Sequence, residues 1–261
     1  MRQSSGSQQS FASSISGSPA TSAIAAINIL FFVWISIKGG PSTQNLVDLG
    51  AKYGPYIADG EYWRLFMPIF LHVSFFHMLT NMFGLIIFGS MVERTFGTRN
   101  FIVIYLTAGL MGNAVSFLAG PNPGVGASGA VFGILGGFGV YLLLNRRLLG
   151  QMGRQQLTSI GVIVGINVVM GLASSGIDNA AHFGGLIAGA IVALLIAPRE
   201  RLFTVETPIN FGTPRMALRT ADQPASRMVA GILIIGVIVV AITWFESGTY
   251  VTNVFGQKIP G

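Results

Sequence analysis

Long apolar runs separated by short polar segments set the pattern of the chain. Seven runs are long enough for a helix to cross a bilayer, which takes about 17–25 residues. Because a helix satisfies its own backbone hydrogen bonds in lipid, we interpret each run as a membrane-spanning helix. The pattern predicts an all-α polytopic membrane protein with spans at residues 21–37, 75–92, 101–119, 128–144, 157–174, 180–197 and 228–245.

The polar segments divide the chain into five parts. Residues 1–20 are rich in Ser, Gln and Gly and are typical of a disordered tail. Residues 21–197 form a predicted six-helix core. A charged segment at 198–227 changes composition abruptly, and we interpret it as a cytoplasmic linker to a seventh helix at 228–245, followed by a tail at 246–261. The predicted architecture is therefore a six-helix bundle plus one extra C-terminal transmembrane helix (6+1).

Composition agrees with a membrane protein. The 261 residues are 51% hydrophobic and only 9% charged, whereas soluble domains carry about 25% charged residues. The chain has no cysteine, which excludes disulfides, a thiol nucleophile and cysteine-ligated metal.

The net charge of +6 is unevenly distributed. If the N-terminus is cytoplasmic, eleven basic residues lie on the inner side and four on the outer side, which is the usual positive-inside asymmetry. The excess of positive charge therefore reflects the orientation of the chain in the membrane. We expect the lipid bilayer as a partner, and no nucleic acid. The inner residues are Arg2, Arg94, Arg99, Arg146, Arg147, Arg154, Arg199, Arg201, Arg215, Arg219 and Arg227, and the outer ones are Lys38, Lys52, Arg64 and Lys258.

The first outer segment, residues 38–74, is long and only partly polar. It contains many aromatic residues and Arg64, interrupted by Gly54-Pro55, Asp59-Gly60 and Pro68. Aromatic and basic side chains favour the bilayer interface. We expect a loop half sunk in the outer leaflet; the alternative is a poorly packed extracellular loop.

Polar residues inside spans are costly and usually functional. Spans 75–92, 128–144 and 180–197 all run from the outer to the inner side. Ser128 begins the second of these, His182 lies near the start of the third, and His77 and Asn81 lie in the first two turns of the first. At a rise of 1.5 Å per residue, all four lie within roughly 5–12 Å of the outer helix ends.

A serine and a histidine at one depth suggest nucleophilic catalysis. The histidine would take the hydroxyl proton as general base and return it to the leaving amine. His77 and Asn81 lie four residues apart and share a helix face. Their side-chain N–H groups, with free backbone N–H groups at the start of span 128–144, could stabilise an oxyanion.

Small residues around Ser128 and His182 predict close helix packing. Gly126 and Gly129 flank Ser128, and Gly185 and Gly189 form a G-x-x-x-G face on span 180–197. Contact between this span and span 128–144 would bring His182 to Ser128. Phe132, one turn below Ser128, could then lie against the His182 ring.

The same residues also allow functions other than catalysis. The small residues and histidines could serve helix packing alone, or the histidines could relay protons in a transporter. We expect no metal, because His72 and His77 are five apart and no carboxylate lies at their level. Asp178 could orient His182 as a third triad member, but we expect that Asp178 or Asn179 caps span 180–197.

The literal dinucleotide fingerprint at Gly124-x-Gly126-x-x-Gly129 is rejected. No strand precedes it, a membrane span follows it, and no acidic residue lies near 20 positions on. We expect no cofactor.

Together these residues resemble the rhomboid family of intramembrane serine proteases over about residues 21–197. The resemblance rests on several short elements whose joint occurrence is specific. They are Gly126-Ala127-Ser128-Gly129, His72-x4-His77-x3-Asn81, Ala181-His182-x-x-Gly185-x-x-x-Gly189, Trp63-Arg64, and Glu93-Arg94 before Gly97.

The resemblance implies roles for the site residues. Ser128 and His182 would form a dyad with no third acid. His77, Asn81 and the Ser128 main-chain N–H would form the oxyanion hole, and His72 would be a structural neighbour. Phe132 stands where the family often has a tyrosine that stacks on the histidine.

The resemblance also implies partners and location. Substrates would be single-span membrane proteins, cut near the outer end of their helix where small or helix-destabilising residues let it unwind. We expect an integral membrane protein of a bacterial plasma membrane with a cytoplasmic N-terminus. The alternative function is a catalytically inactive relative that binds membrane clients.

Overall fold

The computed structural model describes residues 17–174, 176–205, 215–221, 223–253 and 256–261. Within these ranges, six helical segments are long and apolar enough to cross a membrane. An additional apolar helix, α8 (Ser128–Leu144), is slightly shorter, at 17 residues. The predicted all-α polytopic membrane fold is confirmed. The six segments are α2 (Pro19–Ile37), Phe75–Phe96, α7 (Thr98–Ala119), α9 (Arg146–Ala173), α10 (Asn179–Ile196) and α11 (Ala225–Ser247).

Most predicted spans agree with these helices to within a few residues, but the start of one span differs. The predicted loop 145–156 is wrong, because α9 already begins at Arg146 and bends at Gly150, whose φ of 53° is non-helical. A basic segment between two helices therefore continues as helix instead of looping. The predicted disordered tail lies outside the described residues except for 17–20, where α2 begins at Pro19.

The segment Phe75–Phe96 is continuous but not uniform. It consists of α5 (Phe75–Gly84), a π-helical turn η3 (Leu85–Gly89) and α6 (Ser90–Phe96). Gly97, with a φ of 81°, then turns the chain sharply into α7. A positive φ of this kind favours glycine, and the sharp turn makes α6 and α7 neighbours.

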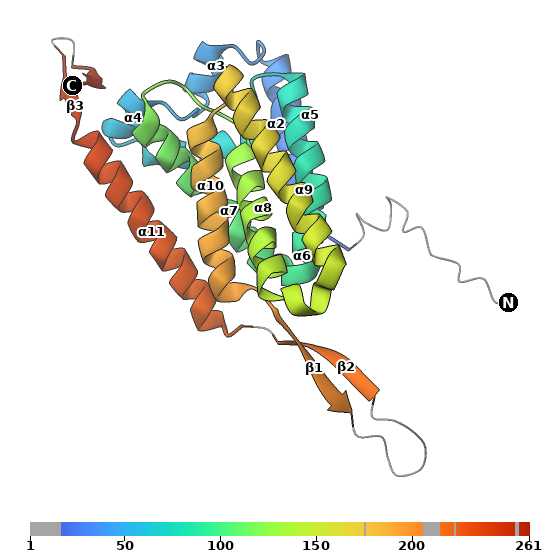
Figure 1. The fold of residues 1–261 in the computed structure, drawn as a ribbon. Coiled ribbons are helices and arrows are strands. Elements are labelled where there is room, and N and C mark those ends of the chain that lie inside the picture. The colour runs from blue at the N-terminus through green and yellow to red at the C-terminus, as the bar shows by residue number, and fades with distance from the viewer. Residues whose placement is uncertain (1–16, 175, 206–214, 222, 254–255) are drawn as a thin grey trace.

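The core of the bundle is built by α7, α8 and α10 (Figure 1). Glycines on α8 and α10 face one another with almost no side chain between the two backbones. A Cβ atom on Gly185 would overlap the carbonyl oxygen of Gly129, and one on Gly189 would overlap that of Gly133. Small residues allow such backbone contact between membrane helices, so these glycines fix α10 against α8.

Glu93 anchors the start of the first helix to the bundle. Its carboxylate accepts hydrogen bonds from the backbone N–H groups of Ala20 (2.9 Å) and Thr21 (2.8 Å) in the first turn of α2. The hydroxyls of Thr21 and Thr98 also donate to it. A carboxylate is favourable at the positive end of a helix, which explains how a nearly buried acid is tolerated there.

The first loop, residues 38–74, is ordered and partly helical. It contains α3 (Thr43–Asp48), α4 (Gly54–Ala58) and two 3₁₀ turns, η1 (Tyr62–Leu65) and η2 (Met67–Phe70). Its aromatic side chains Tyr62, Trp63 and Phe66 are exposed, as expected for residues that lie in the bilayer interface.

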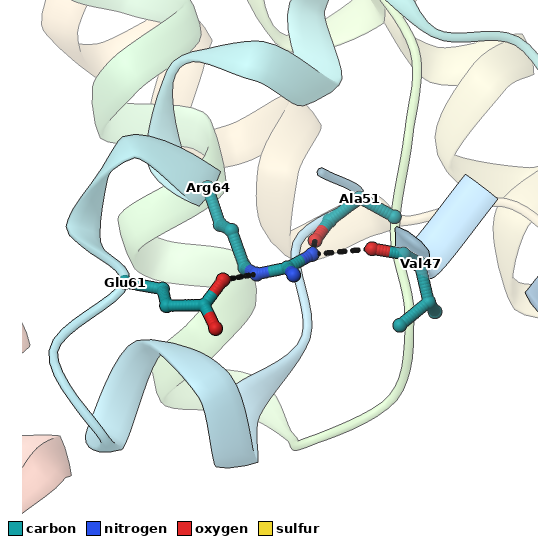
Figure 2. Close-up of polar contacts among 4 residues, drawn as sticks. All are labelled: Val47, Ala51, Glu61 and Arg64. Atoms are coloured by element: carbon teal, nitrogen blue, oxygen red, sulfur yellow. Dashed lines mark hydrogen bonds and ion pairs between the residues drawn. The ribbon is translucent and has the colours of Figure 1, made fainter. Parts of the chain in front are cut away.

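Arg64 holds this loop together from inside (Figure 2). Its guanidinium is buried and donates to Glu61 (2.6 Å), to the Val47 carbonyl (2.5 Å) and to the Ala51 carbonyl (3.3 Å). The cation also lies 4.7 Å from the ring centroid of Trp63, within cation–π range. One arginine thus joins α3 to η1.

Two short hairpins lie outside the helical bundle. The predicted linker 198–227 contains the antiparallel pair β1 (Arg199–Val205) and β2 (Arg215–Ala221), which projects from the end of the bundle opposite the first loop (Figure 1). The predicted tail 246–261 contains β3 (Tyr250–Thr252) and β4 (Lys258–Pro260). Tyr250 is buried, with its ring 5.7 Å from that of Phe117 on α7.

The α8–α10 contact yields a prediction about stability. Gly189→Ala should lower the free energy of unfolding by about 1–3 kcal/mol, because the added methyl group meets backbone that cannot move aside cheaply. Gly236→Ala on α11 is the matched control, since nothing lies within 4 Å of its Cβ position. The control should unfold no earlier than the wild type, because alanine favours helix over glycine by about 1 kcal/mol. Unfolding in detergent, followed by circular dichroism, measures both; equal stability of the two variants would contradict the contact.

Candidate active site

Ser128 is the first residue of α8 and lies two residues after Gly126, whose backbone conformation favours glycine. Gly126 has a φ of 133°, a value that residues with side chains rarely adopt. Its N–H donates to the Pro68 carbonyl at 2.9 Å, which ties the connection to the first loop. The turn places Ser128 at the N-terminus of α8, where its side chain is half-buried. Its backbone N–H has no acceptor within its own helix.

His77 and Asn81 are presented by the first two turns of α5. Ser74 caps this helix, since its hydroxyl accepts from the His77 N–H at 3.1 Å. Asn81 is buried and donates one amide hydrogen to the His77 carbonyl at 2.8 Å. Because an amide carries two N–H donors, one remains for another partner.

Gly126 brings the His77 imidazole close to Ser128. A Cβ at Gly126 would lie 2.7 Å from His77 Cε1, 2.9 Å from His77 Nε2 and 3.8 Å from Ser128 Oγ. Both side chains therefore surround the same small volume, which only a glycine leaves open. The contact agrees with the prediction of a shared depth for His77 and Ser128, two of the four residues concerned.

His182 lies in the first turn of α10, with its ring stacked on Phe132. The two ring centroids are 4.1 Å apart and the planes differ by 9°, as the sequence predicted for this pair. Phe132 and Ser128 are four residues apart on α8, so they share one face of that helix. The stacked ring therefore places the His182 imidazole beside the face of α8 that carries Ser128.

Asp178 is the cap of α10 and not a partner of His182. Its carboxylate accepts from the Ala181 N–H at 2.9 Å and from the Ser116 hydroxyl. In the described part of the chain, His182 Nδ1 is buried without a hydrogen-bond partner. The reading of Asp178 as a third triad member is therefore wrong, and its capping role is confirmed.

His72 lies outside the helices and is fully buried behind His77. The two imidazole centroids are 5.2 Å apart with a 64° angle between planes. Burial lowers the pKa of His72 to about 3, and the neighbouring His77 acts in the same direction. His72 is therefore uncharged near neutral pH and supports the His77 ring by contact.

These contacts link the Ser128 hydroxyl to the His77 imidazole around Gly126, and the His182 imidazole to the helix face of Ser128 through Phe132. Among the described residues, no hydrogen bond joins the Ser128 hydroxyl to an imidazole; such bonds often tighten only when a substrate is bound. A hydroxyl with an imidazole on a neighbouring helix and several N–H donors is an arrangement that suits acyl transfer.

Two polar residues near this site were missed in the sequence. Lys52 was counted only as an outer positive charge, and Ser116 was not singled out. Both are buried, and both connect to Asp178 or to the segment before Ser128. The available signal was a lysine directly before the aromatic residues Tyr53 and Tyr56 of the first loop.

Comparisons with known proteins give a consistent family. A family model described as Rhomboid domain matches residues 59–199, more than half of the chain. Rhomboid protease GluP of Bacillus subtilis is 45% identical over 170 residues, which cover 64% of this chain and 33% of that protein. RHOMBOID-like protein 5 of Arabidopsis thaliana is 37% identical over 165 residues, covering 62% of this chain and 53% of that protein.

A shorter relative is matched over most of its length. Putative rhomboid protease YdcA of Bacillus subtilis is 32% identical over 191 residues, which cover 71% of this chain and 92% of that protein. The chain thus spans about a third of the first relative, about half of the second and nearly all of the third.

The stacking of Phe132 on His182 yields a prediction that needs no activity. In Phe132→Ala, the His182 ring protons should lose the shielding of the aromatic ring and shift downfield in a carbon–proton NMR spectrum. Phe132→Tyr, which keeps the ring, should leave them in place. The chain has only three histidines, so the signals of His72 and His77 serve as internal controls. An unchanged His182 signal in Phe132→Ala would show that the rings do not stack in solution.

Proposed function

The chain belongs to the rhomboid family, and on that premise we propose that it is an intramembrane serine endopeptidase with a Ser128–His182 dyad. The observation that carries the proposal is the stacked pair of His182 and Phe132, with ring centroids 4.1 Å apart. It supports the dyad because Phe132 lies one helical turn below Ser128 on the same face. The names of the relatives, two of which are called rhomboid protease or putative rhomboid protease, support the reaction class.

In the proposed reaction, His182 acts as general base. Its imidazole takes the Ser128 hydroxyl proton while the oxygen attacks the carbonyl carbon of the scissile peptide bond. The protonated imidazole then gives this proton to the leaving amine as the C–N bond breaks. An ester between Ser128 and the N-terminal product remains. Water, deprotonated by the same imidazole, attacks this ester and releases the carboxylic acid and the free serine.

The tetrahedral oxyanion formed in each step needs hydrogen-bond donors. We assign this role to the side chains of His77 and Asn81 and to the Ser128 backbone N–H. Three observations support the assignment: the contact of His77 with Gly126, the one free amide hydrogen of Asn81, and the position of Ser128 at a helix start. Preorganised donors of this kind are among the largest contributions to catalysis.

The depth of the site indicates the substrate class. Ser128, His182 and His77 all lie in the first turn of their helices, at the end of the bundle that carries the first loop. A substrate helix of a single-span membrane protein would therefore be cut near its outer end, where small or helix-destabilising residues expose the carbonyl. The charge asymmetry and the Bacillus relatives support a bacterial plasma membrane and a cytoplasmic N-terminus.

Cleavage of transmembrane reporters tests the proposal. A panel of single-span reporters is incubated with the wild type, Ser128→Ala and His182→Ala in detergent and in liposomes. We expect at least one reporter to be cleaved by the wild type, and each variant to lose at least about a thousandfold in kcat, since the members of such a unit fail together.

The matched control for Ser128→Ala is Ser36→Ala, an exposed serine on α2 whose hydroxyl bonds only to its own helix. This variant should cleave like the wild type. Equal cleavage by Ser128→Ala and the wild type would refute the serine mechanism. Folded wild type that cleaves no reporter, even one offered in its own lipids, would favour an inactive relative that binds membrane clients.

The mechanism also predicts a dependence on pH. His182 must be neutral to accept the serine proton, so the cleavage rate should fall as the pH is lowered and the imidazole becomes charged. The rate is measured by reporter cleavage across the acid range, with unfolding followed at each pH as a control. A rate that stays constant well below about pH 5 in the folded protein would contradict the role of His182.

A further inference from the structure

Lys52 is a buried cation in the first outer loop, between α3 and α4, with only 3% of its surface exposed. Its backbone pairs in both directions with Gly124: the Lys52 N–H donates to the Gly124 carbonyl, and the Gly124 N–H to the Lys52 carbonyl, each at 2.9 Å. The first loop is thereby joined to the connection between α7 and α8. Gly124 lies four residues before Ser128.

The Lys52 ammonium closes the end of α7. It donates to the carbonyl oxygens of Ser116 at 3.2 Å and Gly120 at 3.0 Å. The last carbonyls of a helix lack partners within the helix and carry the negative end of its dipole. A cation at this position is therefore favourable, and it fixes the point at which the chain leaves α7 toward Ser128.

Asp178 supplies the opposite charge. Its carboxylate accepts from the Ser116 hydroxyl and from the Ala181 N–H in the first turn of α10. A Cβ at Gly124 would lie 3.2 Å from Lys52 Cε, 3.5 Å from Asp178 Oδ2 and 3.8 Å from Ser116 Oγ. The three groups therefore meet around one glycine. Asp178 lies four residues before His182, as Gly124 does before Ser128.

We propose that Lys52 is a positioning residue, which fixes the segment before Ser128 relative to the start of α10 before His182. We call the contacts among Lys52, Gly124, Ser116 and Asp178 the frame. The proposal rests on the proposed function for its catalytic consequence, although the contacts themselves do not. Lys52 is the part of the frame that belongs to neither helix: it reaches from the first loop to the end of α7, to Gly124 and toward Asp178. A change in the conformation of this loop would thus alter the positions of Ser128 and His182 together.

The energetics favour a positioning role over simple packing. Burying an ammonium is costly, and well-packed apolar residues often replace buried ion pairs without loss of stability. Burial lowers the pKa of Lys52 to about 8, while the charge of Asp178 opposes this shift. A cation is therefore retained at this position at an energetic cost. Unlike an apolar side chain, it can donate hydrogen bonds with defined directions.

The lowered pKa of Lys52 predicts that cleavage depends on pH in the alkaline range. Asp178 is the charged group that faces Lys52 from the start of α10, and α7 faces it with backbone carbonyls. Above about pH 8 the ammonium loses its proton and its attraction to Asp178. Because the pKa is lower in the folded than in the unfolded chain, this deprotonation does not destabilise the fold. Cleavage should therefore fall above about pH 8 without a loss of stability that is due to Lys52.

Amide hydrogen exchange of the full-length protein in detergent tests the frame without any cleavage. Lys52→Met keeps the length of the side chain and removes its charge and donors. We expect exchange to become faster by about tenfold in residues 120–127 and 176–183 together, the scale set by one lost hydrogen bond to a charged group. Lys38→Met, at an exposed lysine on the same side, should change neither segment.

Asp178→Asn is the second variant, because asparagine still caps a helix. It should accelerate the same two segments, and the double variant should exceed neither single variant, as for residues that act as one unit. If Lys52→Met does not fold, Asp178→Asn alone decides. Unchanged exchange in residues 120–127 in the folded variant overturns the frame, whatever happens to cleavage.

Reporter cleavage then tests the catalytic consequence. Lys52→Met should lower kcat by about tenfold with an unchanged KM, because the geometry of the reacting groups changes and the substrate contacts do not. Its alkaline fall should be absent, since no group at this position titrates. A wild type that cleaves nothing would refute the proposed function and leave the exchange result standing. Faster exchange in both segments with wild-type kcat and an unchanged alkaline fall would refute the positioning role.

Discussion

The direct backbone contact between α8 and α10 is the constraint on which the rest of the structure depends. Gly185 and Gly189 lie against the carbonyls of Gly129 and Gly133, and no side chain fits between the helices. Because lipid does not drive helices together as water does, such close packing is what fixes their relative position. The contact also sets the site, since Ser128 begins one of these helices and His182 lies in the first turn of the other.

Around this contact, the end of the bundle that carries the first loop is held by charged groups that are almost completely buried. Arg64 organises the first loop from within, and Lys52 connects that loop to the end of α7 and to the segment before Ser128. The seventh helix ends in a hairpin whose Tyr250 packs on Phe117 at the same end of the bundle. The extra helix therefore packs against α7, α10 and α4.

Much of the fold and the site could be predicted because both rest on local signals. Apolar runs define the spans, and a chain with three histidines leaves few candidates for a base. The glycine pattern also indicated which helices touch. What could not be predicted depends on tertiary contacts: the early start of α9, the burial of Lys52 and the link of Asp178 to Ser116. The sequence alone does not show whether a polar residue in a loop lies against the end of a helix.

The central claim is that Ser128 is a nucleophile activated by His182, and covalent labelling tests it most directly. The folded protein is treated with a fluorophosphonate probe, digested, and its modified peptide identified by mass spectrometry. The account predicts a single adduct on Ser128 in the wild type, which forms far more slowly in His182→Ala. An adduct on another serine, no adduct in folded wild type, or equal labelling rates in the two proteins would contradict it.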